Sequence, residues 1–144
     1  MNLYLDASAI VKLLVDEDGS QQVQELVARA EGITTSVVSY AEVRSALARK
    51  EREGAFRHGE YQRVLDVLER DWDRYVALQL PLFIARSAGE LTERRGLRAL
   101  DALHLASALL VQSNDDTPIL FLSADRQLQA AAQAEGLETI PLTP

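Results

Sequence analysis

The sequence LYLDASAIVKLLV, residues 3–15, carries the pattern that decides the fold. A short apolar run, Leu3 to Leu5, predicts a buried strand, and a second apolar stretch, Ala9 to Val15, is typical of a buried helix face. Strands that are apolar on successive residues occur mainly in parallel sheets with helices on both faces. The intervening Asp-Ala-Ser would therefore lie at the carboxyl end of a strand, where such sheets place functional groups.

The rest of the chain repeats this alternation of strand and helix. Further strands are predicted at 33–38 (ITTSVV), 75–80, 118–122 (PILFL) and 139–142, and helices at 21–30, 39–53, 58–75, 81–95, 100–111 and 125–134. There is no repeat, low-complexity tract or linker in the sequence. The pattern predicts a single α/β domain over residues 1–144, with a parallel sheet covered by helices on both faces.

The composition limits the classes of function. The chain has 144 residues, 47% of them hydrophobic, and no cysteine, so any metal must be held by oxygen atoms or by the two histidines. No apolar segment approaches the roughly 18 to 20 residues that span a bilayer, and no secretory signal is evident, so a cytoplasmic protein with no membrane contact is expected. The net charge of −7 argues against a broad cationic surface for nucleic acid, although arginines gather at 44–63 and 94–98.

Four acids follow predicted strands or open predicted helices. Asp6 ends the first strand, Glu42 lies in the first turn after the second, and Asp125 comes just past PILFL. Asp101 opens the most apolar helix, where an unpaired carboxylate is costly. Carboxylates that meet at one sheet edge repel each other unless they are protonated or bridged by a cation. Hard oxygen ligands suit Mg²⁺ or Mn²⁺, so the sequence predicts a site for one of these ions.

Each of these acids also has a common structural use. Asp6 or Ser8 would cap the first helix, and Ser39 with Glu42 fits the S-x-x-E capping box. Asp101 would be an N-cap, and the last acid a first-turn residue favoured by the helix dipole. For any single acid, capping is the commoner role, and both uses stay open at this point.

Four segments resemble a known family. They are LYLDASAIVKL (3–13), SVVSYAEVRSAL (36–47), GLRALDALHLASAL (96–109) and LFLSADRQLQAAA (120–132), which together extend over most of the chain. In this order they resemble the PIN-domain ribonucleases, and among these the VapC-type toxins of toxin–antitoxin pairs. The resemblance implies a three-layer α/β/α sandwich around a mainly parallel sheet, an acidic pocket that binds Mg²⁺ or Mn²⁺, and cleavage of RNA.

The resemblance also assigns roles to individual residues. Asp6, Glu42, Asp101 and Asp125 would be the metal-binding and catalytic acids, and Ser8 would support the site. Ser123 stands where the family often has threonine and keeps the hydroxyl, whereas Leu128 stands where some members have a further acid. The sequence therefore gives no support for a fifth carboxylate or for firm binding of a second metal in the absence of RNA, and the choice between one and two metals stays open. The family further implies a VapB-like antitoxin that blocks the pocket, and homodimerisation.

A metal-activated water would hydrolyse the phosphodiester and leave a 5′-phosphate and a 3′-hydroxyl. The basic residues Arg44, Arg49 and Arg52 follow Glu42 on its helix, where they would contact RNA phosphates or form a solvated face. Lys12 is a weaker candidate for the site. His104 is interpreted as a hydrogen-bonded core residue, and the apolar side chains from Tyr61 to Trp72 as core or subunit contact.

Three other functions match part of the pattern. An aspartyl phosphatase of the haloacid dehalogenase type needs an acid two residues after the first, and that position is Ser8. A receiver-like signalling domain needs paired acids after the first strand and a lysine near the last, and both are missing from the sequence. The intact set of four acids argues against a catalytically inactive PIN-like binding or regulatory module, and an assay must distinguish it.

Overall fold

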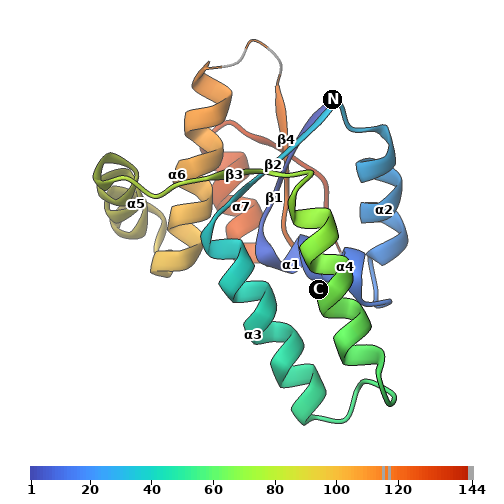
Figure 1. Ribbon diagram of the computed structural model, residues 1–144. Coiled ribbons are helices and arrows are strands. Elements are labelled where there is room, and N and C mark those ends of the chain that lie inside the picture. The colour runs from blue at the N-terminus through green and yellow to red at the C-terminus, as the bar shows by residue number, and fades with distance from the viewer. Residues whose placement is uncertain (115, 117, 143–144) are drawn as a thin grey trace.

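The computed structural model describes residues 1–114, 116 and 118–142. Positions 115, 117 and 143–144 of the predicted domain lie outside the described residues. Its centre is a parallel five-stranded sheet in the order β3-β2-β1-β4-β5 (Figure 1). The strands are β1 (Asn2–Leu5), β2 (Gly32–Ser36), β3 (Val76–Leu78), β4 (Ile119–Leu122) and β5 (Glu138–Thr139).

Helices fill every connection between these strands. They are α1 (Ala7–Leu14), α2 (Ser20–Arg29), α3 (Val38–Arg52), α4 (Glu60–Trp72), α5 (Leu82–Arg95), α6 (Ala99–Asn114) and α7 (Arg126–Ala134). The chain builds outward from β1 to β2 and β3 on one side, and from β4 to β5 on the other. The strand order therefore reverses between β1 and β4, which is where open α/β sheets form their ligand-binding crevice.

The two faces of β1 pack into two separate cores. Leu3 and Leu5 lie in a core formed with α1 to α4, whereas Tyr4 lies in a second core with α5, α6 and α7. Successive side chains of a strand point to opposite faces, so one short strand supplies both cores. Tyr4 stacks on Phe121 of β4, with ring centroids 5.4 Å apart. Helices thus cover both faces of the sheet, as Figure 1 shows, and the three-layer α/β/α prediction is confirmed.

The predicted elements are all present, with shifted ends. The helix predicted from residue 58 begins at Glu60, because Gly59 has the left-handed φ of 77° that ends the preceding turn. The strand predicted at 75–80 is only three residues long, and the one predicted at 139–142 is Glu138–Thr139. The apolar side chains of α4, Tyr61 and Trp72 included, pack in the core with α1 to α3, which confirms the core interpretation. Among the described residues, no helix has the length and apolar character to cross a membrane.

Candidate active site

A pocket of about 310 Å³ opens at the carboxyl edge of the sheet, beside the point where the strand order reverses. Its lining residues come from the helices α1, α3 and α6 and from the positions just before α1, α6 and α7: Asp6, Ala7, Ser8, Val11, Glu42, Ala46, Arg49, Arg98, Asp101, His104 and Asp125. All four acids predicted from the sequence are among them. Another pocket, of about 280 Å³, lies between α5 and α6 and is lined by one carboxylate, Glu90, so it lacks this concentration of charge.

Asp6 follows β1 and serves two purposes. Its Oδ1 accepts hydrogen bonds from the backbone N–H of Ala9, at 3.0 Å, and from the hydroxyl of Ser8, at 2.6 Å. It is therefore the N-cap of α1, and its side chain also lines the pocket. Burial raises the pKa of Asp6, and the charge of His104 and the hydroxyls of Ser123 and Ser8 oppose that rise. The capping role and the pocket role are compatible.

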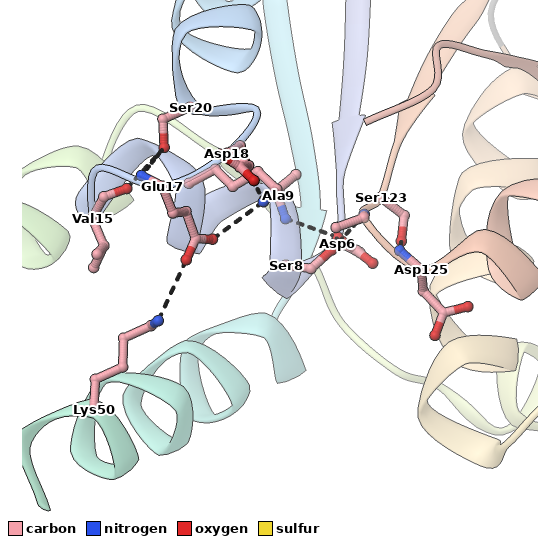
Figure 2. Close-up of polar contacts among 12 residues, drawn as sticks. Asp6, Ser8, Ala9, Val15, Glu17, Asp18, Ser20, Lys50, Ser123 and Asp125 are labelled. Atoms are coloured by element: carbon pink, nitrogen blue, oxygen red, sulfur yellow. Dashed lines mark hydrogen bonds and ion pairs between the residues drawn. The ribbon is translucent and has the colours of Figure 1, made fainter. Parts of the chain in front are cut away.

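Asp125 has the equivalent position after β4. Its Oδ1 accepts the N–H of Leu128 at 2.8 Å, which makes it the N-cap of α7, whereas the sequence placed it inside the first turn. Its own N–H is held by the hydroxyl of Ser123 at 3.0 Å. Figure 2 shows Asp6 and Ser8 beside Ser123 and Asp125. The side chain of Leu128 is fully buried, so this position adds no polar group to the pocket.

Ser8 connects the ends of the two central strands. Its hydroxyl donates to Asp6 and accepts the N–H of Ala124 at 2.8 Å. One side chain thus ties the loop after β1 to the loop after β4. The supporting role predicted for Ser8 agrees with this geometry, and Ser123, which is completely buried, holds the adjacent turn.

Asp101 lies in the first turn of α6 and is not its N-cap, so the capping alternative was wrong for this residue. Its pKa is raised, first by burial and then by the negative charge of Asp125, while Arg98 lowers it. The Nε of Arg98 lies 3.6 Å from Asp101 Oδ2, and this arginine side chain is 85% exposed. An acid with a raised pKa and acidic neighbours in a pocket is a candidate for function.

Glu42 does not form the predicted capping box. Helix α3 begins at Val38, and the hydroxyl of Ser39, inside the helix, bonds to Thr35 Oγ1 at 2.7 Å instead of capping. Glu42 Oε1 lies 2.7 Å from Nε2 of His104 on α6. Because β2 ends at Ser36 and the helix starts at once, Glu42 is one full turn into α3 and faces the pocket rather than its own helix end.

His104 is a core residue that also contacts a site acid, a contact that the sequence did not predict. It is a core histidine with both ring nitrogens hydrogen-bonded, as predicted, and it is 1% exposed. One of its two partners, however, is a site acid. The available signal was its spacing from Asp101, three residues along the same helix, which places both side chains near one face.

The basic residues near the pocket differ in part from those expected. Arg49 lines it, while Arg44 donates to the hydroxyl of Tyr40 at 3.0 Å and Arg52 is exposed at the end of α3. Arg98 also lines the pocket and was missed, although its spacing to Asp101 is that of a helical ion pair. Lys12 does not face the site.

Lys12 is buried and belongs to a separate ionic group. Its ammonium donates to Glu17 Oε1 at 3.3 Å and to the carbonyl of Asp18 at 2.6 Å. The other carboxylate oxygen of Glu17, Oε2, lies 3.3 Å from the ammonium of Lys50 on α3, a contact visible on the left of Figure 2. This group joins α1 to α3 and explains why a lysine so close to the first acid contributes nothing to the pocket.

The donor set of the pocket suits a hard divalent cation. Four carboxylates and the hydroxyl of Ser8 line it, and oxygen ligands of this kind are those that Mg²⁺ and Mn²⁺ prefer. Within the described part of the chain, no three His, Asp or Glu side chains are gathered in ligating geometry. The fit therefore rests on the chemistry and common placement of the donors.

Comparisons with known proteins agree with this arrangement. The PIN domain family model matches residues 3–134. The chain is 36% identical over 143 residues to Ribonuclease VapC45 of Mycobacterium tuberculosis (strain CDC 1551 / Oshkosh), covering 96% of this chain and 94% of the relative.

Two solved structures share the fold at low identity. One is a toxin-antitoxin complex from Klebsiella pneumoniae, with TM-score 0.57 and 17% identity over 85% of this chain and 88% of that chain. The other is VapBC2 from Rickettsia felis bound to a DNA fragment from their promoter, with TM-score 0.64 and 18% identity over 99% of each chain. The chain belongs to the PIN-domain family and, within that family, is similar to the VapC-type ribonucleases.

Proposed function

We propose that this chain is a Mg²⁺- or Mn²⁺-dependent endoribonuclease and the toxin component of a type II toxin–antitoxin pair. The observation that carries the proposal is that the four family acids, on or beside four different elements, line one pocket. Relatives named as VapC ribonucleases over nearly the whole chain support the activity. The chain would act as one PIN-like domain.

The acids have distinct tasks in the proposed mechanism. Asp6, Asp101 and Asp125 would hold the cation through carboxylate oxygens. Glu42 would contact the cation through the attacking water, which it would orient and from which it would accept a proton. When bound at these acids, Mg²⁺ would lower the pKa of the attacking water and stabilise the negative charge that develops on the phosphate and the leaving oxygen. Ser8 and Ser123 fix the turns that present Asp6 and Asp125.

Basic residues at the rim would hold the RNA backbone. Arg49 on α3 and Arg98 before α6 line the pocket together with the acids. A guanidinium binds phosphate through two parallel hydrogen bonds, so each arginine can fix one phosphate beside the reacting one. Arg44 and Arg52 are further from this role, because Arg44 is bonded to Tyr40 and Arg52 ends the helix.

The partner proposed is a VapB-like antitoxin that covers the pocket. Its support is the shared fold with a protein described as part of a toxin-antitoxin complex. Homodimerisation and a cytoplasmic location remain expectations from the family resemblance. The molar mass of the purified chain in solution, measured by light scattering, tests the dimer.

The decisive experiment is cleavage of defined RNA by the purified chain, with and without Mg²⁺, compared with Asp6→Asn. Asparagine caps a helix about as well as aspartate, so this variant keeps α1 while it removes a ligand charge. Cleavage should fall by about 10²- to 10⁴-fold, as for loss of a principal catalytic group. Chelation of Mg²⁺ should have the same effect on the wild type.

The ends of the products test the chemistry. Attack by water leaves 5′-phosphate and 3′-hydroxyl ends, so 2′,3′-cyclic phosphates would contradict the mechanism. A folded wild-type chain that never cleaves RNA, with either ion present, would instead establish the inactive binding module.

A further inference from the structure

A buried hydrogen-bonded chain runs from the middle of the sheet to the pocket. The hydroxyl of Tyr4 in β1 lies 2.9 Å from Nδ1 of His104 in α6, and Nε2 of His104 lies 2.7 Å from Oε1 of Glu42 in α3. Tyr4 is 0% exposed and His104 1%, so both are shielded from solvent, and His104 borders the pocket from below its surface. The central strand and one helix from each layer, α6 and α3, therefore meet in one line of polar contacts that ends on a pocket acid.

The carboxylate of Glu42 fixes the direction of the bond that it forms. A carboxylate only accepts hydrogen bonds, so the contact with Glu42 requires a proton on Nε2 of His104. The hydroxyl of Tyr4 is the partner of Nδ1 on the other side of the ring. It donates to Nδ1 when the ring is neutral and accepts from it when the ring is protonated, and Nε2 carries a proton in both cases.

The rings are also held in place. Tyr4 stacks on Phe121, and it meets the imidazole of His104 edge-on at a centroid distance of 5.9 Å. His104 follows Asp101 by about one helical turn. Its bond to Glu42 therefore fixes the position of the Glu42 carboxylate relative to Asp101. No other hydrogen bond to Glu42 is found among the residues described, and Glu42 lines the pocket.

We propose that Tyr4 and His104 are positioning residues that hold one oxygen of Glu42 and present the other to the reacting water. This rests on the proposed nuclease function, in which Glu42 acts on that water. A glutamate side chain loses considerable rotamer freedom when it is fixed. The Tyr4–His104 pair fixes it before substrate arrives. Removing a hydrogen-bonded partner of a metal ligand typically lowers metal affinity or activity about 10- to 100-fold.

The first test is a direct observation of the imidazole in the full chain without metal. Nitrogen-15 NMR of the histidine rings, with His58→Gln to assign the two signals, should show the His104 proton on Nε2. In Tyr4→Phe, which keeps the ring and its packing on Phe121, the Nδ1 shift should move because its hydrogen-bond partner is gone. A His104 ring with its proton on Nδ1 alone would overturn the proposal.

The second test separates positioning from packing. His104→Leu should lower kcat by about 10- to 100-fold with KM for RNA nearly unchanged. His104→Gln restores an N–H donor near the place of Nε2 and should recover most of that loss. Tyr4→Phe should have a smaller effect than His104→Leu. Equal losses in the leucine and glutamine variants would mean that the ring acts only as core filling.

The third test asks whether His104 acts through Glu42. We would measure Mn²⁺ affinity by water proton relaxation in His104→Leu, Glu42→Gln and the double variant. The histidine change should weaken Mn²⁺ binding in the wild-type background and add nothing once Glu42 is glutamine. Additive effects would overturn the proposal. Since neither NMR nor Mn²⁺ binding needs RNA cleavage, a failure of the nuclease proposal would be seen separately, in a wild type that does not cleave.

Discussion

Two groups of charged side chains in this protein are arranged in opposite ways. In the acidic pocket, burial raises the pKa values of Asp6 and Asp101, and the negative charge of Asp125 raises that of Asp101 further. In the second group, which we call the arginine clamp, Arg94 and Arg95 of α5 both bond to Glu135 after α7. There the pKa of the carboxyl falls to about 2, chiefly through the two guanidinium hydrogen bonds.

The difference shows what each group does. The clamp joins two helices and stabilises the folded chain when its carboxylate is ionised. The pocket holds like charges together at a cost in stability that only a role in binding explains, as is common at functional sites. Carboxylates of one chain thus either stabilise the fold or reduce its stability, and their neighbours decide which.

The largest expected effect comes from removing one pocket charge. Asp101→Asn should abolish cleavage and at the same time stabilise the metal-free chain at pH 7, by about 0.5–2 kcal/mol. The sign follows from the raised pKa: the ionised form is penalised in the folded state above that pKa, and the penalty disappears as pH falls below the ordinary value of 3.8. Thermal unfolding with chelator, at pH 7 and near the acid limit of folding, measures this.

The gain in melting temperature should be about 2–4 °C per kcal/mol and should shrink as the pH is lowered. The ion pair that Asp101 loses with Arg98 is long and exposed, so it offsets little of the gain. A variant less stable than the wild type at pH 7, with metal absent, would contradict the view that the pocket carries a cost.

A smaller effect is expected from replacing an arginine that lines the pocket. The same contrast between pocket and clamp applies to the basic side chains. Arg94 and Arg95 are engaged with Glu135, whereas Arg98 lines the pocket and, among the residues that the structure describes, has one ion pair, the 3.6 Å contact with Asp101. Arg98→Ala should raise KM for RNA roughly 3- to 10-fold, as for loss of one hydrogen bond worth about 1 kcal/mol. The dependence of binding on salt should also weaken, by a slope of about 0.7 for one phosphate contact on a single strand.

Arg49→Ala should behave in the same way, and Arg44→Ala is the matched control. Arg44 lies on the same helix, is exposed, and is bonded to Tyr40 away from the pocket lining. If the Arg44 variant raises KM as much as the Arg49 variant, then an arginine does not need to line the pocket in order to contribute to RNA binding.

The smallest effect should come from the clamp itself. Glu135→Gln should lower the free energy of unfolding at pH 7 by up to about 1 kcal/mol, a limit set by the exposure of the arginines. Because the folded pKa lies below the ordinary 4.5, this stabilisation is present above about pH 4.5 and is lost between there and about pH 2. Denaturant unfolding across that range measures it.

Cleavage by the Glu135 variant should equal that of the wild type, because the clamp is not among the residues that line the pocket. A stability difference that persists unchanged at the acid end would assign the effect of Glu135 to packing and not to its charge.

Much of the site could be predicted from local pattern. Asp6 and Asp125 each follow an apolar strand and precede a helix, so their places at the sheet edge follow from the direction of a parallel strand. Glu42 was placed at the same edge, but its capping box was not found, because the helix starts one residue earlier, at Val38. A shift of one residue at a helix start reassigns every side chain of its first turn.

The sequence by itself determined the alternation of strands and helices, the two-sided apolar character of β1 and the presence of an acid after each central strand. Those properties depend on residues close together in the chain. Only the tertiary structure decided that Glu42 would meet His104, that Arg98 would border the pocket and that Lys12 would turn to Glu17. The physical reason is that such contacts join residues on separate helices, whose relative positions are set by how both layers pack on the sheet.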